Sequence, residues 1–523
     1  MSVELIKDLL KIDQTIGKDQ IQALVEGEIT VPDSKPKINK VLNIDGSAEV
    51  LEKRIVKDKV VVSGIVNFKV LYSAKDDNQP IHSLDSKADF SEEIEIKGVT
   101  DQMMGDVKAD IEHIDYSMTD EDKIGVKTVL SIEGKVQAED NIDIVKEIQG
   151  TKGLQVKKEK IKYNNTVGFN NTTTIVNEAF ELEEEMPDII DILRVDSKAF
   201  ERETKIVDDK AIVAGTVEVS IMYFGDDSEN RINQFTREIP FTHFVEIPGA
   251  LKDMDYITEI KATDPVYNTR DDINGNVRVM DFEAIVKINA KVFEQREKEV
   301  TVDTYSTNKK FDITKKEIDV TENIGTLTKK EDVKGVIDVS EANEIIQNIY
   351  NVNAKPILTD YRIIEGKVVI EGLVNTNMLY LEEESEEIKD ISKEIPFKVY
   401  ADIDNVKEGM ESEVNVSLDN LKFNKKNSRE VEVDISVKNN ISVNRTKKIN
   451  IITEALELEE DIDKRNRPSI TIYIAQENDT LWDIAKRFNT TVEELISTNE
   501  IMTPNNIMPG EKIIIEKHLD MDF

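Results

Sequence analysis

The chain contains no cysteine in its 523 residues, and it has only four histidines and one tryptophan. The absence of cysteine excludes disulfides, thiolate nucleophiles and zinc–thiolate sites, and it is compatible with a cytosolic protein. Basic residues are also scarce, because 68 lysines and arginines stand against 106 aspartates and glutamates, which gives a formal net charge of −38. A nucleic-acid-binding protein or a polybasic membrane-surface binder needs a basic footprint. The composition therefore argues against both classes.

Long apolar runs are missing as well. No segment reaches the roughly 20 apolar residues of a membrane span, and the start of the chain lacks the basic residues and apolar run of a secretory signal. We therefore expect no direct membrane insertion and a protein that stays in the cytosol of the cell that makes it. With 39% hydrophobic and 33% charged residues, the sequence fits a folded protein with modest cores.

The sequence repeats one pattern three times. Residues 54–64, 205–215 and 362–372 each contain a charged segment followed by an apolar one that ends in glycine. Eight residues after that glycine each copy has a tyrosine, and a phenylalanine recurs further on. These repeated aromatic residues are Tyr72, Tyr223, Tyr380, Phe90, Phe241 and Phe397.

Each copy has the pattern of a β-strand. In the first copy the residues from Val60 to Tyr72 are apolar at almost every second position, and Gly64 lies in the same row. A period of two is typical of a strand with one buried face. A glycine on that face predicts a bulge or a close backbone approach. Hairpin turns are predicted just before the three strands, at the pairs Lys57-Asp58, Asp208-Asp209 and Glu365-Gly366.

We infer a mainly β protein with three homologous antiparallel β-rich repeat domains, each of about 150 residues. The predicted boundaries are 1–150, 151–305 and 306–460 for the repeats, 461–468 for a polar linker and 469–518 for a small terminal domain. Three stretches between the strand patterns look helical in composition and are expected to form helices, namely 174–182, 339–346 and 452–458.

The terminal domain differs from the repeats. Residues 470–474 and 512–515 alternate as short strands, and two helices are predicted between them. Thr480 and Thr491 are each followed three residues later by an acidic residue, which is the pattern of a helix N-terminus. The expected order is strand, helix, helix, strand.

This terminal segment resembles the LysM domain. The matching residues are 479–485, Asn499 and 509–513. The family usually has a glycine before the Asp-Thr pair, where this chain has Asn478. Asparagine tolerates the left-handed backbone better than most residues, so the turn is expected to survive.

Three β-rich repeats followed by a LysM domain resemble the SipL-like spore coat morphogenetic proteins, whose repeats are of the SPOCS type. The resemblance implies a non-enzymatic adaptor in the mother-cell cytoplasm that is recruited to the forespore surface and the spore coat. Its LysM domain would bind the coat basement-layer ATPase SpoIVA and so promote coat assembly and encasement of the forespore. Other coat proteins are further partners to be expected.

The candidate partner-binding residues lie in the LysM-like segment. The apolar stripe that starts at Leu481 points inward, which leaves Trp482 and Lys486 on the flank of the first helix. An exposed aromatic residue beside a groove is a good interface anchor. The alternative is that Trp482 folds down over its own domain and serves packing.

The family resemblance also implies a sugar groove between loops 476–481 and 499–509. Asp479 and Asn506 would help to hold an N-acetyl group there, whereas the alternative is that Asp479 and Thr480 only cap a helix. The alternative function is a peptidoglycan- or N-acetylglucosamine-binding cell-wall protein, and we favour protein binding. The full set of candidate residues is Trp482, Asp479, Thr480, Leu481, Lys486, Asn499 and Asn506.

Patterns of catalytic or metal-binding residues are not found. Residues 270–275 superficially suggest a calcium loop, but Arg270 stands where the loop needs an aspartate. Asn274-Gly275 is better explained as a hairpin turn. The acidic runs 183–185 and 382–387 are expected to be solvated. We therefore expect no enzyme, no cofactor and no metal site, since no ligand spacing surrounds His82, His113, His243 or His518.

Overall fold

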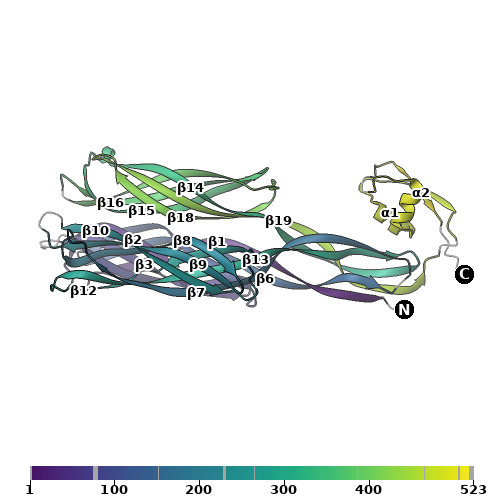
Figure 1. Cartoon of the computed structure of the whole chain (residues 1–523), viewed down its shortest axis with the longest axis horizontal. Helices are drawn as coiled ribbons and strands as arrows, with labels where there is room; N and C mark the ends of the chain where they lie inside the picture. Colours follow the sequence, from purple (N-terminus) through teal and green to yellow (C-terminus); the bar gives the residue numbers. More distant parts are fainter. Residues whose placement is uncertain are drawn as a thin grey trace.

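The computed structural model describes residues 3–74, 81–150, 152–227, 231–263, 265–385, 387–463, 466–504 and 507–517. The chain forms a head, a stalk that extends from the head, and a small module at the far end of the stalk (Figure 1). Within the described ranges, no helix is long and apolar enough to cross a bilayer.

The prediction of three antiparallel β-rich repeats is confirmed. Each repeat is a sandwich of two sheets with a hydrophobic core between them. One sheet is built on two very long antiparallel strands, which are the first and the last strands of the repeat. The other sheet has at its centre the strand that carries the repeated sequence pattern.

The strands of the first repeat are β1 (Glu4–Thr30), β2 (Ile38–Val56), β3 (Lys59–Ala74), β4 (Ile81–Glu95), β5 (Met104–Asp120) and β6 (Lys123–Gln149), with sheet orders β1-β6-β5 and β2-β3-β4. Those of the second are β7 (Leu154–Glu181), β8 (Ile189–Val207), β9 (Lys210–Gly225), β10 (Ile232–Glu246), β11 (Asp255–Ala262), β12 (Val266–Asp271) and β13 (Val277–Ser306). Here β8-β9-β10 form one sheet, and β7, β11 and β12 all pair with β13. The third repeat has β14 (Lys309–Asp338), β15 (Ile346–Ile364), β16 (Lys367–Glu382), β17 (Ile388–Asp402), β18 (Glu411–Lys425) and β19 (Glu430–Asp461), with orders β14-β19-β18 and β15-β16-β17.

The alternating pattern correctly identified the central strands β3, β9 and β16. In β3 the row from Val60 to Tyr72 is buried, with Val62, Val66 and Tyr72 each 0% exposed. The predicted hairpin turns are confirmed at all three places. Their second residues have the left-handed backbone of such turns, with φ of 62°, 61° and 76° at Asp58, Asp209 and Gly366, respectively.

The recurring glycine and phenylalanine explain each other. In the second repeat Gly215 is the cross-strand partner of Phe241, and a Cβ on Gly215 would lie 2.6 Å from the Phe241 ring and from the Phe200 carbonyl oxygen. The glycine therefore makes room for the ring in the core, as the predicted close approach requires. The same cross-strand pairs recur in the other repeats as Gly64–Phe90 and Gly372–Phe397.

The recurring tyrosines tie each sandwich to the segment that enters it. The hydroxyl of Tyr72 donates to the carbonyl of Pro36 at 3.0 Å, and that of Tyr223 donates to Pro187 at 3.1 Å. Tyr380 donates instead to the carboxylate of Glu344. A buried hydroxyl without a partner would be costly, so these acceptors allow a tyrosine at the centre of the core.

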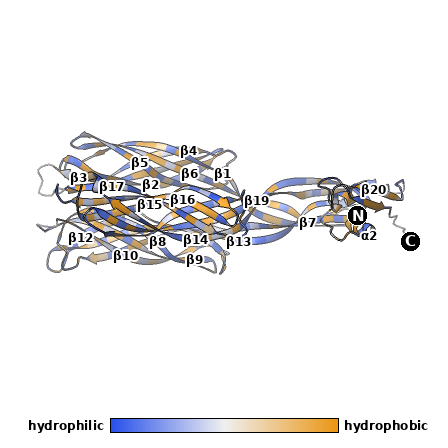
Figure 2. Cartoon of the chain, turned by 90° about the horizontal axis from the view of Figure 1, so that it is seen from above, coloured by the Kyte–Doolittle hydropathy of each residue, from blue (hydrophilic) through white to orange (hydrophobic). Residues whose placement is uncertain are grey.

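Three long strand pairs leave the head and form the stalk. These ribbons are β1 with β6, β7 with β13 and β14 with β19. Seen from above, the stalk continues from the head toward the module, and hydrophobic and hydrophilic residues alternate along the strands (Figure 2). The inward residues of all three ribbons form one core, made of Leu10, Ile12, Ile142, Ile144, Ile161, Tyr163, Val300, Ile318, Val320, Ile449 and Ile451.

A second shared core joins the three sandwiches inside the head. Leu42, Leu193 and Tyr350 sit at register shifts of β2, β8 and β15, at the same position in each repeat. A bulge of this kind re-aims a side chain, and these three meet in one cluster. The other members also come from equivalent strands, namely Leu71, Ile81, Met222, Phe224, Ile232, Leu379 and Ile388.

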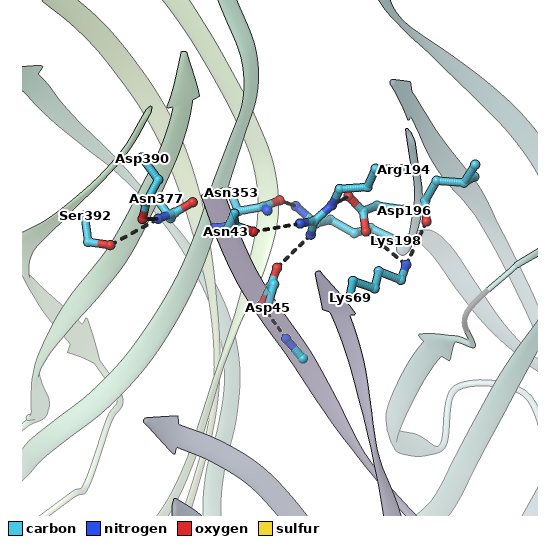
Figure 3. Close-up of polar contacts among 12 residues, drawn as sticks. Asn43, Asp45, Lys69, Arg194, Asp196, Lys198, Asn353, Asn377, Asp390 and Ser392 are labelled. Carbon is cyan, nitrogen blue, oxygen red and sulfur yellow. Dashed lines mark hydrogen bonds and ion pairs between the residues drawn. The ribbon is translucent and has the colours of Figure 1, made fainter. Parts of the chain in front are cut away.

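Beside this core the repeats meet through polar side chains (Figure 3). Arg194 donates to Asp196 at 2.5 Å and to Asp45 of the first repeat at 2.7 Å. Lys69 of the first repeat donates to Asp196 at 3.1 Å, and Lys198 reaches Asn353 of the third repeat at 3.0 Å. We call these residues, together with Asn43, the axial polar cluster. Because equivalent positions carry different residues in the three repeats, the cluster favours one mutual arrangement of the sandwiches.

The axial polar cluster is charged, and it is most shielded from solvent at its centre, where the side chains of Arg194 and Asp196 are 8% and 17% exposed. Burial alone would raise the pKa of Asp196, but the charges of Arg194 and Lys69 outweigh it and lower the pKa to about 2. Burial would also lower the pKa of Arg194, yet Asp196 and Asp45 raise it. Arg194 and Asp196 are therefore ionised together across the physiological range.

The three helical predictions outside the terminal module are wrong. Residues 174–181 lie in β7 and 452–458 lie in β19, while 339–346 contain only a short 3₁₀ turn, Ser340–Ala342, before β15. Alanine, leucine and glutamate gave these stretches a helical composition. Pairing with a neighbouring long strand overrides so weak a preference, since each backbone group there finds its partner in the ladder.

Substituting Gly215 by alanine is expected to destabilise the protein by about 1–3 kcal/mol, because the new methyl group collides with the Phe241 ring and a backbone carbonyl. Chemical denaturation measures the change. Gly125→Ala is the matched control, since a Cβ there meets its nearest neighbours at an ordinary 3.5 Å. Equal stability of the two variants would contradict the steric explanation.

Replacing Arg194 by methionine is expected to destabilise the protein by about 3 kcal/mol, because it leaves the buried Asp196 with Lys69 alone. The control is Arg270→Met, which breaks the exposed ion pair with Asp281 and should cost about 0–1 kcal/mol. Urea unfolding of both variants compares the two costs.

The pH dependence of the same site follows from the sign of the pKa shift. The pKa of Asp196 is lowered in the folded state, so its contribution is present above its unfolded pKa and is lost as the pH falls. The stability advantage of the wild type over Asp196→Asn should therefore be about 1 kcal/mol smaller at pH 3 than at pH 5. An advantage that grows on acidification would contradict the assignment.

Candidate binding site in the C-terminal module

The terminal module has the predicted order of elements. It consists of β20 (Ile470–Ile474), α1 (Leu481–Phe488), α2 (Val492–Asn499) and β21 (Lys512–Glu516), with β20 and β21 antiparallel. The helices cover one face of this two-stranded sheet. Their shared core contains Leu481, Ile484, Ala485, Leu495, Ile513 and Ile515.

Both helices start with a capping box, as the threonine–acid spacing predicted. The Thr480 hydroxyl accepts the Asp483 N–H at 3.2 Å, and the Asp483 carboxylate accepts the Thr480 N–H at 3.2 Å. Thr491 and Glu494 repeat the arrangement at 3.0 and 3.1 Å. Of the candidate residues, Thr480 thus caps α1 and Leu481 is a core residue that is only 3% exposed.

The turn before α1 is fixed from within. Asn478 takes the left-handed backbone with φ of 68°, as expected for the residue that stands in place of the family's glycine. The Asp479 carboxylate accepts the Tyr473 hydroxyl at 2.6 Å and the Gln476 N–H at 2.8 Å. These hydrogen bonds lower the pKa of Asp479. Asp479 therefore holds the loop in shape.

Asn499 also has a structural partner set. Its amide donates to the Leu495 carbonyl at 2.9 Å and to the Ile514 carbonyl at 2.7 Å, while its oxygen accepts the Ile514 N–H at 2.7 Å. It therefore joins α2 to β21. The remaining candidate of this loop, Asn506, lies outside the described residues.

Trp482 and Lys486 lie on the flank of α1, as predicted, and this flank contacts the stalk. The indole N–H of Trp482 donates to Asp303 of β13 at 2.7 Å, and Lys486 donates to the same carboxylate at 2.7 and 2.9 Å. The Trp482 ring meets Tyr305 edge-on, with the ring centroids 5.0 Å apart. Trp482 is thus neither a free interface anchor nor packed only on its own domain, because it contacts the stalk of the same chain.

The stalk residues of this contact were not among the residues predicted from the sequence. Asp303 is 8% exposed and Tyr305 is 5% exposed, and the Tyr305 hydroxyl donates to the Thr490 carbonyl at 2.8 Å. Burial would raise the pKa of Asp303, but hydrogen bonds from Lys486, Trp482 and Lys315 lower it. The signal that could have found Tyr305 is an aromatic residue at a position where the other repeats have Gln149 and Leu456.

The outer face of the module's sheet is apolar and exposed. Ile470, Ile472 and Ile474 point away from the helices along β20, with 59%, 61% and 43% of their surface exposed. Ile514, which is directly opposite Ile472 on β21, is 37% exposed. We call these four residues the isoleucine face. Exposed apolar side chains that lie next to one another in this way are typical of an interaction surface.

Two protein-family models match the chain, one at the repeats and one at the terminal module. The SipL SPOCS domain model matches residues 37–119, 188–268 and 345–426, and the LysM domain model matches 473–516. The chain is a SipL-like protein. These domains fit a sporulation protein related to the coat that carries a LysM module. No significant match was found among curated proteins or among solved structures.

The SPOCS matches correspond to a defined part of each sandwich. In the first repeat the match runs over β2 to β5 and leaves out the long strands β1 and β6, and the other two matches likewise leave out β7, β13, β14 and β19. The long strands that build the stalk therefore come directly before and after each matched segment in the sequence.

The other charged motifs have structural roles where they are described. Asp272 accepts the N–H groups of Asn274 and Asn276 in the hairpin between β12 and β13, so the suspected calcium loop is a turn, as predicted. In the described ranges no three histidine or acidic side chains converge as metal ligands would. The expectation that run 382–387 is solvated is wrong for Glu382, which is 4% exposed and accepts the Ser385 N–H at 2.6 Å.

Substituting Asn499 by alanine is expected to destabilise the LysM domain by about 1–3 kcal/mol, because two backbone groups of Ile514 lose their partners. Hydrogen exchange of the amides of residues 469–517, measured by mass spectrometry along a urea series, reports on this domain. Asn466→Ala, outside the domain core, is the control. An unchanged midpoint for Asn499→Ala would show that its hydrogen bonds are not structural.

Proposed function

We propose that the chain is a non-enzymatic spore coat morphogenetic adaptor. Its LysM domain binds the SpoIVA-type coat ATPase, and the bound chain promotes coat assembly and encasement of the forespore. The protein acts in the mother-cell cytoplasm and is recruited to the forespore surface. Other coat proteins are partners of the three SPOCS domains.

The observation that carries this proposal is the isoleucine face of the LysM domain. Its four side chains expose a continuous apolar strip, with Ile472 and Ile514 paired across the strands. Sugar polymers are recognised by hydrogen bonds and ring faces, whereas a strip of branched aliphatic side chains gains most from burial against another protein. The polar Asp479, by contrast, is already engaged inside its own loop.

The layout of the molecule supports an adaptor role. The LysM domain lies at one end of the stalk and the three sandwiches lie at the other (Figure 1). A partner held by the module is therefore separated from the head, which stays free for further contacts. If the partner polymerises on a surface, many such weak contacts act together and raise the apparent affinity.

Charge also favours a protein partner of opposite sign. The net charge of −38 keeps the free protein soluble and creates a negative field around it. A basic patch on the partner would speed encounter, and the apolar strip would then supply the lasting contact.

The decisive test is Ile472→Asp, which should weaken binding to the purified SpoIVA-type ATPase at least tenfold, because a charge then has to be desolvated at the centre of the strip. The control is Ile273→Asp at an exposed hairpin of the second repeat, where Ile273 is 100% exposed. Biolayer interferometry measures both affinities, and circular dichroism checks the fold. Equal affinities would contradict the role of the isoleucine face.

The alternative, binding of peptidoglycan, is decided by a parallel experiment. Co-sedimentation of the full chain with purified peptidoglycan, abolished by Asp479→Ala and unaffected by Ile472→Asp, would replace the proposed function with glycan binding. We expect no co-sedimentation.

Deletion of 469–523 should abolish recruitment to the forespore, while the cores of the three sandwiches remain folded.

A further inference from the structure

The contact between the LysM domain and the stalk is specific to one of three equivalent ribbons. After matching register shifts, Asp303 pairs with Lys157, Glu147 pairs with Ile6, and Glu454 pairs with Thr314. These three acidic residues therefore occupy one position in the three repeats. Glu147 and Glu454 are exposed, whereas Asp303 is covered by the LysM domain.

The residue two places further along the strand also differs between the three ribbons. It is Tyr305 in the second ribbon, exposed Gln149 in the first and Leu456, 62% exposed, in the third. Only the second ribbon thus offers a carboxylate followed by an aromatic ring on the same face of a strand. The LysM domain lies on that pair.

The flank of α1 matches this pair chemically. The indole N–H of Trp482 and the ammonium of Lys486 both donate to the Asp303 carboxylate, at 2.7 Å each. The carboxylate therefore lies between two hydrogen-bond donors. The edge-on contact of Tyr305 with Trp482 adds an aromatic pair, a geometry worth about 0.5–1.5 kcal/mol beyond its buried area. The flank is therefore a receptor for an acid and an aromatic ring that lie two residues apart on a strand.

The contact is suited to release. Desolvating a carboxylate and an ammonium opposes most of their attraction, so an ion pair of this kind has a small net stability. Both capping boxes of the LysM domain form without the stalk, and Tyr305 is the one stalk residue among the buried members of its core. Eight residues lie between Asp461 and Ile470, and at about 3.5 Å per residue they allow the domain to leave the stalk while tethered.

We infer that the α1 flank is a protein-binding site for an acidic–aromatic segment, that Asp303 and Tyr305 fill it in the free chain, and that a partner with such a segment displaces the stalk. The part of this inference that concerns the partner rests on the proposed function, and it requires that the same partner bind the α1 flank as well as the isoleucine face. The part that concerns the stalk does not. The stalk contact thus acts as an intramolecular competitor that lowers the apparent affinity of the LysM domain by the fraction of molecules in which it is released.

The first experiment tests the stalk contact alone, in the full chain and without a partner. Asp303→Ala removes the acceptor of Trp482, so the fluorescence of this single tryptophan should shift to longer wavelength and its iodide quenching constant should rise at least twofold. Glu454→Ala, at the equivalent position of the third ribbon, should change neither quantity. Quenching of Asp303→Ala equal to that of the wild type would overturn the inference.

A second variant guards against loss of the fold. Tyr305→Phe keeps the ring and removes only the hydrogen bond to Thr490, so it should raise quenching less than Asp303→Ala does. If circular dichroism shows that Asp303→Ala is unfolded, Lys486→Gln replaces it, because it opens the same contact from the LysM side. Wild-type quenching in Lys486→Gln would likewise overturn the inference.

The second experiment tests the partner with the purified SpoIVA-type ATPase. Asp303→Ala should bind it more tightly than the wild type, about tenfold if the closed form is favoured ten to one. Lys486→Glu, which repels the incoming acid, should bind at least tenfold more weakly. Weaker or equal binding by Asp303→Ala would refute competition. If neither the wild type nor Asp303→Ala binds, the proposed function and the partner role both fail, while the fluorescence result still decides the stalk contact.

Discussion

The structure depends on the burial of apolar side chains along one line where the three repeats meet. At the head this line is the cluster around Leu42, Leu193 and Tyr350, and in the stalk it is the core shared by the three ribbons. Each ribbon has only two strands over the length of the stalk, and an isolated two-stranded ribbon is marginally stable in water. Three ribbons together bury one another's inner faces. The three repeats therefore form one body.

This arrangement changes what the repeats can do. Three separate modules on flexible linkers would present their faces independently, but here the axial polar cluster fixes them in one order. Arg194 joins the first and second repeats, and Lys198 joins the second and third. Buried charges contribute little net stability, but they penalise wrong pairings strongly because an unmatched charge would be left without a partner. The sequence differences between the repeats thus define their mutual places.

The same differences place the LysM domain. The second ribbon carries Asp303 and Tyr305 at positions where the other ribbons expose Glu147, Gln149, Glu454 and Leu456. A chain built from three copies of one fold has three similar stalk edges, and the pair Asp303 and Tyr305 distinguishes one of them. The docked domain leaves its isoleucine face open while its α1 flank is covered, so the two surfaces differ in availability in the free protein.

Much of this could be predicted from the sequence, and the reason is local. Alternation from Val60 to Tyr72, the turns at Asp58, Asp209 and Gly366, and the capping boxes of Thr480 and Thr491 each depend on residues a few positions apart, so period and backbone preference were sufficient to find them. The helical predictions failed at 174–182 and 452–458 because strand pairing with distant residues outweighed local composition. Distant pairing also decided the stalk, the axial polar cluster and the contact of Trp482 with Asp303, 179 residues away. Those contacts come from burial and complementary charge between segments that the linear order does not bring together, so only the tertiary structure could decide them.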